Sequence, residues 1–281
     1  MDPLVFTAVL AAAACHAGWN ALLKLRLAPV VATVLVAVTA GVLVLPLLPL
    51  TPAPARAAWP YIVASAIVHV AYFVTLAEAY RWGDLSQVYP IARGTAPLLT
   101  ATLASLWLNE ALGGNGWAGV IVLATGILLL TFKGGRDLAR FDGRAVAFAL
   151  ATSLTITAYT LIDGIGARLA GSALGYTVWL FVGNGITMAI YGWPRVGRRL
   201  VADFRGHWRM ALAGAALSTA AYAIAIWAMT VAPIALVAAL RETSVLFAAV
   251  FGTMLLREPL LPLRLMAAVL VLAGALLLRF R

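Results

Sequence analysis

The chain contains few charged residues and almost no cysteine. Only 11% of its 281 residues are charged and 64% are hydrophobic, whereas soluble globular domains carry roughly 25% charged residues. Its mean hydropathy is +0.99. This composition excludes an ordinary soluble domain and predicts an integral membrane protein. The single cysteine, Cys15, excludes a disulfide within the chain.

Motifs for cofactor binding and for common enzyme classes are also missing. The sequence has no Walker loop, no phosphate-binding glycine motif, no metal-spaced His/Cys cluster and no nucleophile elbow. We therefore expect no cofactor, no ATP bound by this chain and no enzymatic activity. An intramembrane enzyme acting on lipid is the weaker alternative, because it would require a convergent acid and histidine constellation with large polar loops.

The positive charge is almost entirely arginine. The net charge is +10, and Lys24 and Lys133 are the only lysines. Most of the arginines fall in short segments between apolar runs, where anionic headgroups and membrane topology explain them better than a nucleic-acid surface does. The lipid bilayer is the expected partner, and no nucleic acid is expected.

Ten apolar runs are long enough to cross a bilayer, which takes about 20 residues each. The sequence therefore predicts an all-α integral membrane protein with ten transmembrane helices. Glycine and proline clusters separate the runs, and the longest hydrophilic loop is expected between about residues 193 and 208. The expected spans are 4–23, 30–50, 59–80, 85–108, 115–132, 145–168, 173–193, 208–230, 233–256 and 261–280.

The two halves of the chain repeat each other. Arg93 and Arg241 are separated by 241 − 93 = 148 residues, and the same offset pairs Thr95 with Thr243, Glu110 with Glu258 and Gly126 with Gly274. The repeats are expected at 1–133 and 144–281, joined by a polar linker at 134–143. Because five crossings is an odd number, the second repeat must run through the membrane in the opposite direction, as in carriers built from inverted repeats.

The loop charges predict an orientation. Most arginines and both lysines follow the first, third, fifth, seventh and ninth runs. By the positive-inside rule these loops are cytoplasmic. The expected location is a bacterial inner membrane with both termini on the periplasmic side.

The sequence resembles the drug/metabolite transporter superfamily, in particular its EamA-domain carriers. The similarity covers the whole chain and is carried by the steps Leu106-Trp-Leu-Asn-Glu110 and Met254-Leu-Leu-Arg-Glu258-Pro, each followed by an apolar run with Gly126 or Gly274. The resemblance implies a ten-helix transporter fold, whereas relatives differ in substrate. Most relatives keep both termini in the cytoplasm, and the loop charges of this chain depart from that pattern.

Polar and aromatic residues inside four of the runs are candidates for a binding cavity. His16, Trp19 and Asn20 lie on one helix face, as do His69 and Tyr72. The alternative is that they only make contacts between helices. In the sixth and eighth runs Tyr159 and Tyr222 are selected, whereas Asp163, at helical spacing from Tyr159, is not.

The two repeat-related arginines are the strongest candidates for the centre of the site. A cation in hydrocarbon is costly and normally faces a cavity or a partner. Tyr89 precedes Arg93 by one turn, and Pro90 and Pro97 flank it; Glu242 follows Arg241 and is expected to pair with an arginine of another helix. Only one acid then accompanies two arginines, which favours an anion-attracting centre over a purely structural network.

These observations predict a secondary transporter, an exporter or exchanger. Its substrate would be a small polar or amphipathic metabolite, such as an amino acid or another organic anion or zwitterion, moved by alternating access between the repeats. The alternative transport reading is a lipid or lipid-linked-sugar flippase, which needs a cavity open sideways to lipid. His16, Glu78 and Glu242 are candidates for proton coupling. A monomer or a homodimer is expected.

Overall fold

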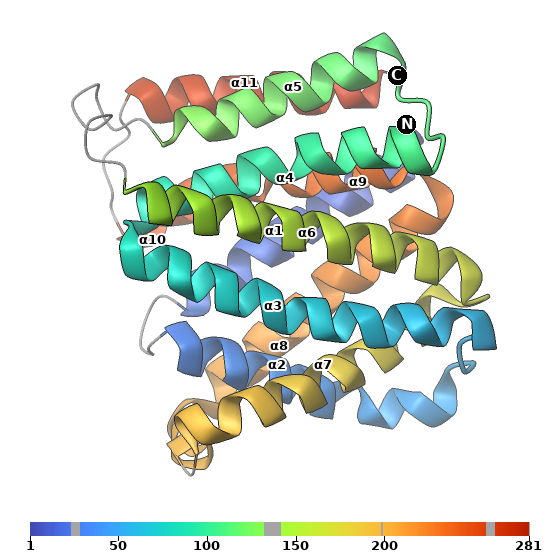
Figure 1. Cartoon of the computed structure of the whole chain (residues 1–281), viewed down its shortest axis with the longest axis vertical. Helices are drawn as coiled ribbons and strands as arrows, with labels where there is room; N and C mark the ends of the chain where they lie inside the picture. Colours follow the sequence, from blue (N-terminus) through green and yellow to red (C-terminus); the bar gives the residue numbers. More distant parts are fainter. Residues whose placement is uncertain (24–28, 132–141, 198, 257–261, 281) are drawn as a thin grey trace.

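The computed structural model describes residues 1–23, 29–131, 142–197, 199–256 and 262–280, which are helical and contain no strand. Figure 1 shows the helices running side by side. A helix satisfies its backbone polar groups within one segment, so apolar runs without access to water take this form. The elements are α1 (Pro3–Leu23), α2 (Pro29–Val44), η1 (Leu45–Leu50), η2 (Arg56–Ala58), α3 (Trp59–Trp82), α4 (Leu85–Trp107), α5 (Gly113–Leu129), α6 (Gly143–Leu169), α7 (Ala173–Val196), α8 (Arg199–Val231), α9 (Ile234–Arg241), α10 (Ser244–Leu256) and α11 (Pro262–Arg279).

Seven described helical segments are long and apolar enough to cross a membrane, so the chain is a multi-pass membrane protein. α5 is shorter, with 17 residues, and α4 contains Arg93 and two prolines. The ninth expected span is divided between α9 and α10. The count of ten crossings therefore stays a prediction.

Two sequence predictions are wrong in detail. The expected helix 233–256 is interrupted at Glu242 and Thr243, so two shorter helices replace it. The expected loop at 193–208 is mostly helical, because α7 continues through Pro194 and α8 begins at Arg199. His207, expected in that loop, lies instead at a kink within α8, with φ −132° and ψ 21°.

The helix contacts follow the repeat. α1 packs against α8, and α3 packs against α6. Because α1 corresponds to α6 and α3 to α8 in the repeat, these two contacts are equivalent. α2 packs against α7, α4 against α9 and α5 against α11, which pairs each helix with its own counterpart. Figure 1 shows α5 and α11 together at one edge of the molecule, with α6 between α3 and α4. The two halves are therefore interleaved, and their shared interior lies along α4, α6 and α9.

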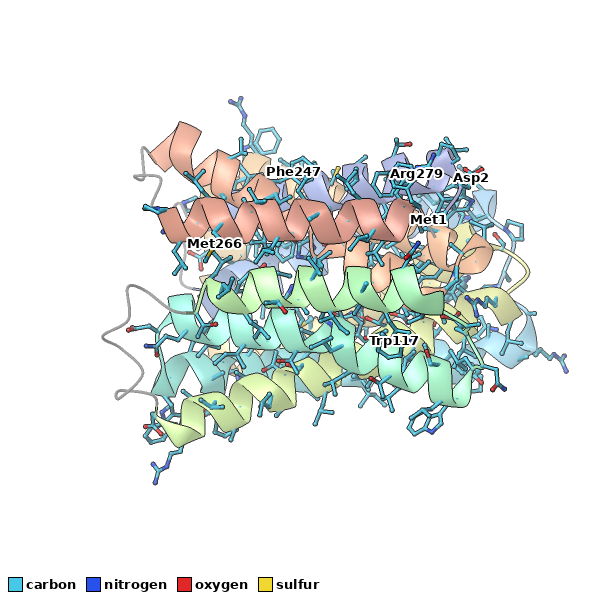
Figure 2. All side chains as sticks on the ribbon, turned by 90° about the horizontal axis from the view of Figure 1, so that it is seen from above. Met1, Asp2, Trp117, Phe247, Met266 and Arg279 are labelled. Carbon is cyan, nitrogen blue, oxygen red and sulfur yellow. The ribbon has the colours of Figure 1, made fainter. Side chains whose placement is uncertain are left out.

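The first and last helices meet end to end. The Met1 ammonium group donates to the carbonyl oxygen of Arg279 at 3.1 Å, and Nη1 of Arg279 donates to the carbonyl oxygen of Met1 at 2.7 Å. Figure 2 shows Met1, Asp2 and Arg279 beside one another. The start of α1 and the end of α11 therefore lie at the same side of the bundle, as an even number of crossings requires.

Candidate functional site

A small polar cavity lies between the halves. It is lined from α4 by Arg93, Ala96, Pro97 and Thr100, from α6 by Ile156, Tyr159 and Thr160, and from α9 and the residue after it by Ala238, Arg241 and Glu242. Its free volume is about 10 Å³, roughly the room that one water molecule needs. The cavity is therefore too small for a metabolite, which can enter only if these helices move apart.

The break after α9 places two opposite charges next to each other. Arg241 is the last residue of α9, and Glu242 is its C-cap, two residues before α10 begins at Ser244. A helix carries partial negative charge at its C-terminus, so the Arg241 cation is stabilised at the end of α9. The turn is tightened by Thr243, whose hydroxyl donates to the carbonyl oxygen of Leu240 at 2.6 Å.

The repeat-related arginines have different environments. Nε of Arg93 is 2.7 Å from Oε2 of Glu242, and both side chains are buried. The two side chains therefore form a buried ion pair. Arg241 has no ion pair among the described residues; its guanidinium lies 5.0 Å from the centre of the Tyr222 ring. Arg241 is only 9% exposed, so it brings to the cavity a buried cation without an ion-pair partner among the described residues.

A second acid lies beside the cavity. Asp163 of α6 is completely buried. It accepts a hydrogen bond from the Tyr176 hydroxyl at 3.0 Å and another from the Tyr222 hydroxyl. The expectation of one acid for two arginines is therefore wrong: in the part of the chain that the structure describes, the buried charged residues are Arg93, Arg241, Glu242 and Asp163. Their formal charges balance when all four are ionised.

The structure brings most of the predicted site residues together. Arg93, Tyr159, Arg241 and Glu242 line the cavity, and the pairing of Glu242 with an arginine of another helix is confirmed. An aromatic cluster adjoins them: the His69 ring stacks on Tyr159 at 4.3 Å, and the Tyr72 and Tyr222 rings lie 5.9 Å and 6.4 Å from that of Tyr159. The Tyr89 ring lies 6.0 Å from the Arg93 guanidinium.

Four other predicted residues lie outside the cavity lining. Nε1 of Trp19 donates to Nδ1 of His16 at 3.3 Å, and Nδ2 of Asn20 donates to the His16 carbonyl oxygen at 2.8 Å. These α1 residues therefore bond to one another, on a helix that packs against α9 and α10. Glu78, a proton-coupling candidate, lies near the end of α3 and pairs with Arg81 at 3.6 Å.

Glu110 and Arg168 form a polar cluster at the start of α9, called the clamp below. The sequence did not indicate this cluster. Glu110, selected only as part of the family step, accepts backbone hydrogen bonds from Ile234 at 3.0 Å and from Ala235 at 3.4 Å. Arg168 donates to Glu110 at 2.7 Å and also to the carbonyl oxygens of Met229 and Ala232. The repeat partner of Glu110, Glu258, lies outside the described residues. Residues distant in sequence thus hold α9 in place, and no local sequence pattern indicates that they meet.

The comparisons with known proteins agree with this architecture. A solved crystal structure, whose title names no function, superimposes with a TM-score of 0.73 over 99% of this chain and 96% of its own, at 13% sequence identity. At this identity the likeness shows the fold alone. No curated protein sequence matches the chain significantly. The sequence profile of the EamA-like transporter family matches residues 3–132 and 143–280, one match in each half. The chain therefore belongs to the EamA-like transporter family.

Proposed function

We propose that this protein is a secondary carrier for a small metabolite with a carboxylate group, such as an amino acid. Membership in the family supports transport in general. The observation that carries the substrate class is Arg241, a buried guanidinium that lines the cavity without an ion-pair partner among the described residues. A guanidinium binds a carboxylate through two parallel hydrogen bonds, a geometry that few other groups match.

The cavity lining also offers acceptors for an ammonium group. Pro97 has no amide hydrogen, so the carbonyl oxygen of Arg93, one turn earlier in α4, lacks its intrahelical donor. Glu242 adds a carboxylate to the lining, which is paired with Arg93 when the cavity is empty. A zwitterion would therefore find a cation for its carboxylate and acceptors for its amine within one cavity.

The small cavity and the interleaved repeats support alternating access. Because only about 10 Å³ is free, binding and release require the halves to separate, and an inverted repeat allows equivalent openings to the two sides of a membrane. We place the protein in a bacterial inner membrane with the odd-numbered loops in the cytoplasm, as a monomer or homodimer, acting as an exporter or exchanger.

The test is uptake by liposomes that contain the purified protein. We expect one or more radiolabelled amino acids or monocarboxylates from a panel to accumulate with the wild type. Arg241→Gln should reduce that uptake at least tenfold, while Arg209→Gln, an exposed arginine of α8, should leave it unchanged. Uptake of no carboxylate, with movement of a lipid-linked sugar instead, would contradict the proposal and favour a flippase.

A conservative variant tests whether geometry or charge matters. Arg241→Lys should not restore uptake, because an ammonium group lacks the planar pair of donors that holds a carboxylate. Thermal stabilisation by the transported compound provides the matching binding measurement, since a ligand that binds only the folded state raises apparent stability. Normal uptake and stabilisation in Arg241→Lys would show that charge alone suffices.

A further inference from the structure

Asp163 is a buried acid that the proposed substrate site does not use. None of its surface is exposed, and two tyrosine hydroxyls, from α7 and α8, donate to its two oxygen atoms. No cation lies within ion-pair distance of this carboxylate among the described residues. Burying an unpaired carboxylate costs several kcal/mol, so its ionised form depends on the more distant charges around it.

Those charges and titratable groups come from every helix around Asp163. α3 contributes His69 and the Ser65 hydroxyl, and α6 itself contributes Tyr159. Tyr176 comes from α7 and Tyr222 from α8. The nearest arginine in this chain of contacts is Arg241 of α9, followed by the Arg93–Glu242 pair across the cavity.

The neighbouring histidine does not supply the missing cation. Nδ1 of His69 lies 2.9 Å from the carbonyl oxygen of Ser65, and a carbonyl can only accept, so this nitrogen carries the donated hydrogen. The ring stacks on Tyr159 and meets Tyr222 edge-on at 5.9 Å. A second proton on this apolar-walled ring would be costly, so His69 is neutral here.

Tyr222 connects Asp163 with the substrate site. Its hydroxyl donates to Asp163, and the Arg241 guanidinium lies over its ring. Arg241 is thus separated from Asp163 by one side chain, and a cation at that separation would support the ionised form of the acid. A carboxylate bound to Arg241 would cancel that support, and the acid would then be more stable with a proton.

We propose that Asp163 is a proton-binding site of the carrier, and that it takes up its proton when an anionic group of the substrate neutralises Arg241. The proton comes from water on the side to which the cavity is open and binds one carboxyl oxygen of Asp163. One tyrosine hydroxyl then turns to accept from the new O–H group. A monocarboxylate brings one negative charge and the proton one positive charge, so a carrier loaded with both buries no additional net charge. Only this coupling step depends on the proposed function.

The proton site can be tested without any substrate. Infrared difference spectra of the full chain in lipid nanodiscs report the carbonyl stretch of a protonated carboxyl group as the pH is lowered. We expect such a band in the wild type and its loss in Asp163→Asn. In Arg241→Gln, which mimics the neutralised guanidinium, the band should appear at a pH about one unit higher, because a lost cation favours the neutral acid.

Two further variants keep the test decisive. In Arg241→Lys, unlike Arg241→Gln, the band should appear close to the wild-type pH, because the positive charge, and not the planar shape of the guanidinium, acts on Asp163. If Asp163→Asn does not fold, Tyr222→Phe should shift the frequency of the same band, because it removes one hydrogen-bond donor. The proposal would be overturned by a band that is identical in the wild type and Asp163→Asn. It would also be overturned if Tyr222→Phe left the frequency of the band unchanged and Arg241→Gln left its pH of appearance unchanged. Failure of the proposed function would appear instead as absent uptake with these spectra unchanged.

Discussion

At the scale of single residues, the two repeat-related arginines have different surroundings. Arg93 is held by Glu242 at 2.7 Å, whereas Arg241 contacts only the face of Tyr222 among the described ion-pair and ring partners. Arg93 therefore links α4 with the α9–α10 break, and we propose that Arg241 binds the ligand. An internal repeat can thus retain a residue type while the surroundings of its two copies diverge.

Loss of Glu242 should destabilise the protein more than loss of a surface acid. Glu242→Gln leaves the Arg93 guanidinium buried without a counter-charge, which costs about 3–5 kcal/mol. Glu78→Gln is the matched control, because its exposed pair with Arg81 is worth at most about 1 kcal/mol. Thermal unfolding in detergent measures both, and equal small shifts would contradict a supporting role for the Arg93–Glu242 pair.

The sequence indicates the arginines but not their surroundings. A cation inside an apolar run is expensive wherever it occurs, so Arg93 and Arg241 were recognisable, and their shared offset suggested that they meet. The break at Glu242 was not predictable, because residues 241–244 contain neither glycine nor proline. Asp163 was not selected, because its interest lies in the hydrogen bonds from Tyr176 and Tyr222, and only the folded chain brings these residues to it.

At the scale of elements, α9 is a short and fully buried helix. It has eight residues, with Arg241 at its C-terminal end. All four of its first amide groups have acceptors: two in the Glu110 carboxylate and two in the carbonyl oxygen of Pro233. A helix this short is marginal by itself, so the clamp fixes the position of the charged centre.

Weakening the clamp should loosen α9 locally. Glu110→Gln removes a negative charge from the helix N-terminus and from the partner of Arg168, and we expect a loss of about 1–2 kcal/mol. Amide hydrogen exchange at Ile234 and Ala235 should accelerate. The comparable cap of α1, where Asp2 accepts from Leu4 at 2.8 Å, gives the control: Asp2→Asn should affect exchange in α1 alone. Unchanged exchange in α9 after Glu110→Gln would mean that the clamp is dispensable.

At the scale of the whole molecule, the repeat is most visible where α5 meets α11. Gly126 and Gly274 occupy equivalent positions and face each other's helix at very close approach. A Cβ atom at Gly274 would lie 2.6 Å from the backbone nitrogen of Leu123, and one at Gly126 would lie 3.0 Å from the carbonyl oxygen of Ala267. Small residues at such crossings allow helices to pack tightly in lipid.

Adding a methyl group at this crossing should separate the two helices. Gly274→Ala is expected to lower stability by about 1–3 kcal/mol, because the nearest atoms belong to backbone that cannot rotate away. Gly206→Ala, where no atom lies within 4 Å of the added Cβ, should be neutral or slightly stabilising. A thermal unfolding comparison decides the matter, and equal midpoints for the two variants would contradict the close packing described here.

The central claim is that the cavity between the halves opens to each side of the membrane in turn. Ala238 lines the cavity one turn before Arg241, so Ala238→Cys in a Cys15→Ser background reports its accessibility. An impermeant thiol reagent should label this cysteine in right-side-out and in inside-out vesicles, while Ala149→Cys, buried away from the cavity lining, stays unlabelled from both. Labelling of Ala238→Cys from one side only, or from neither, would contradict alternating access through this site.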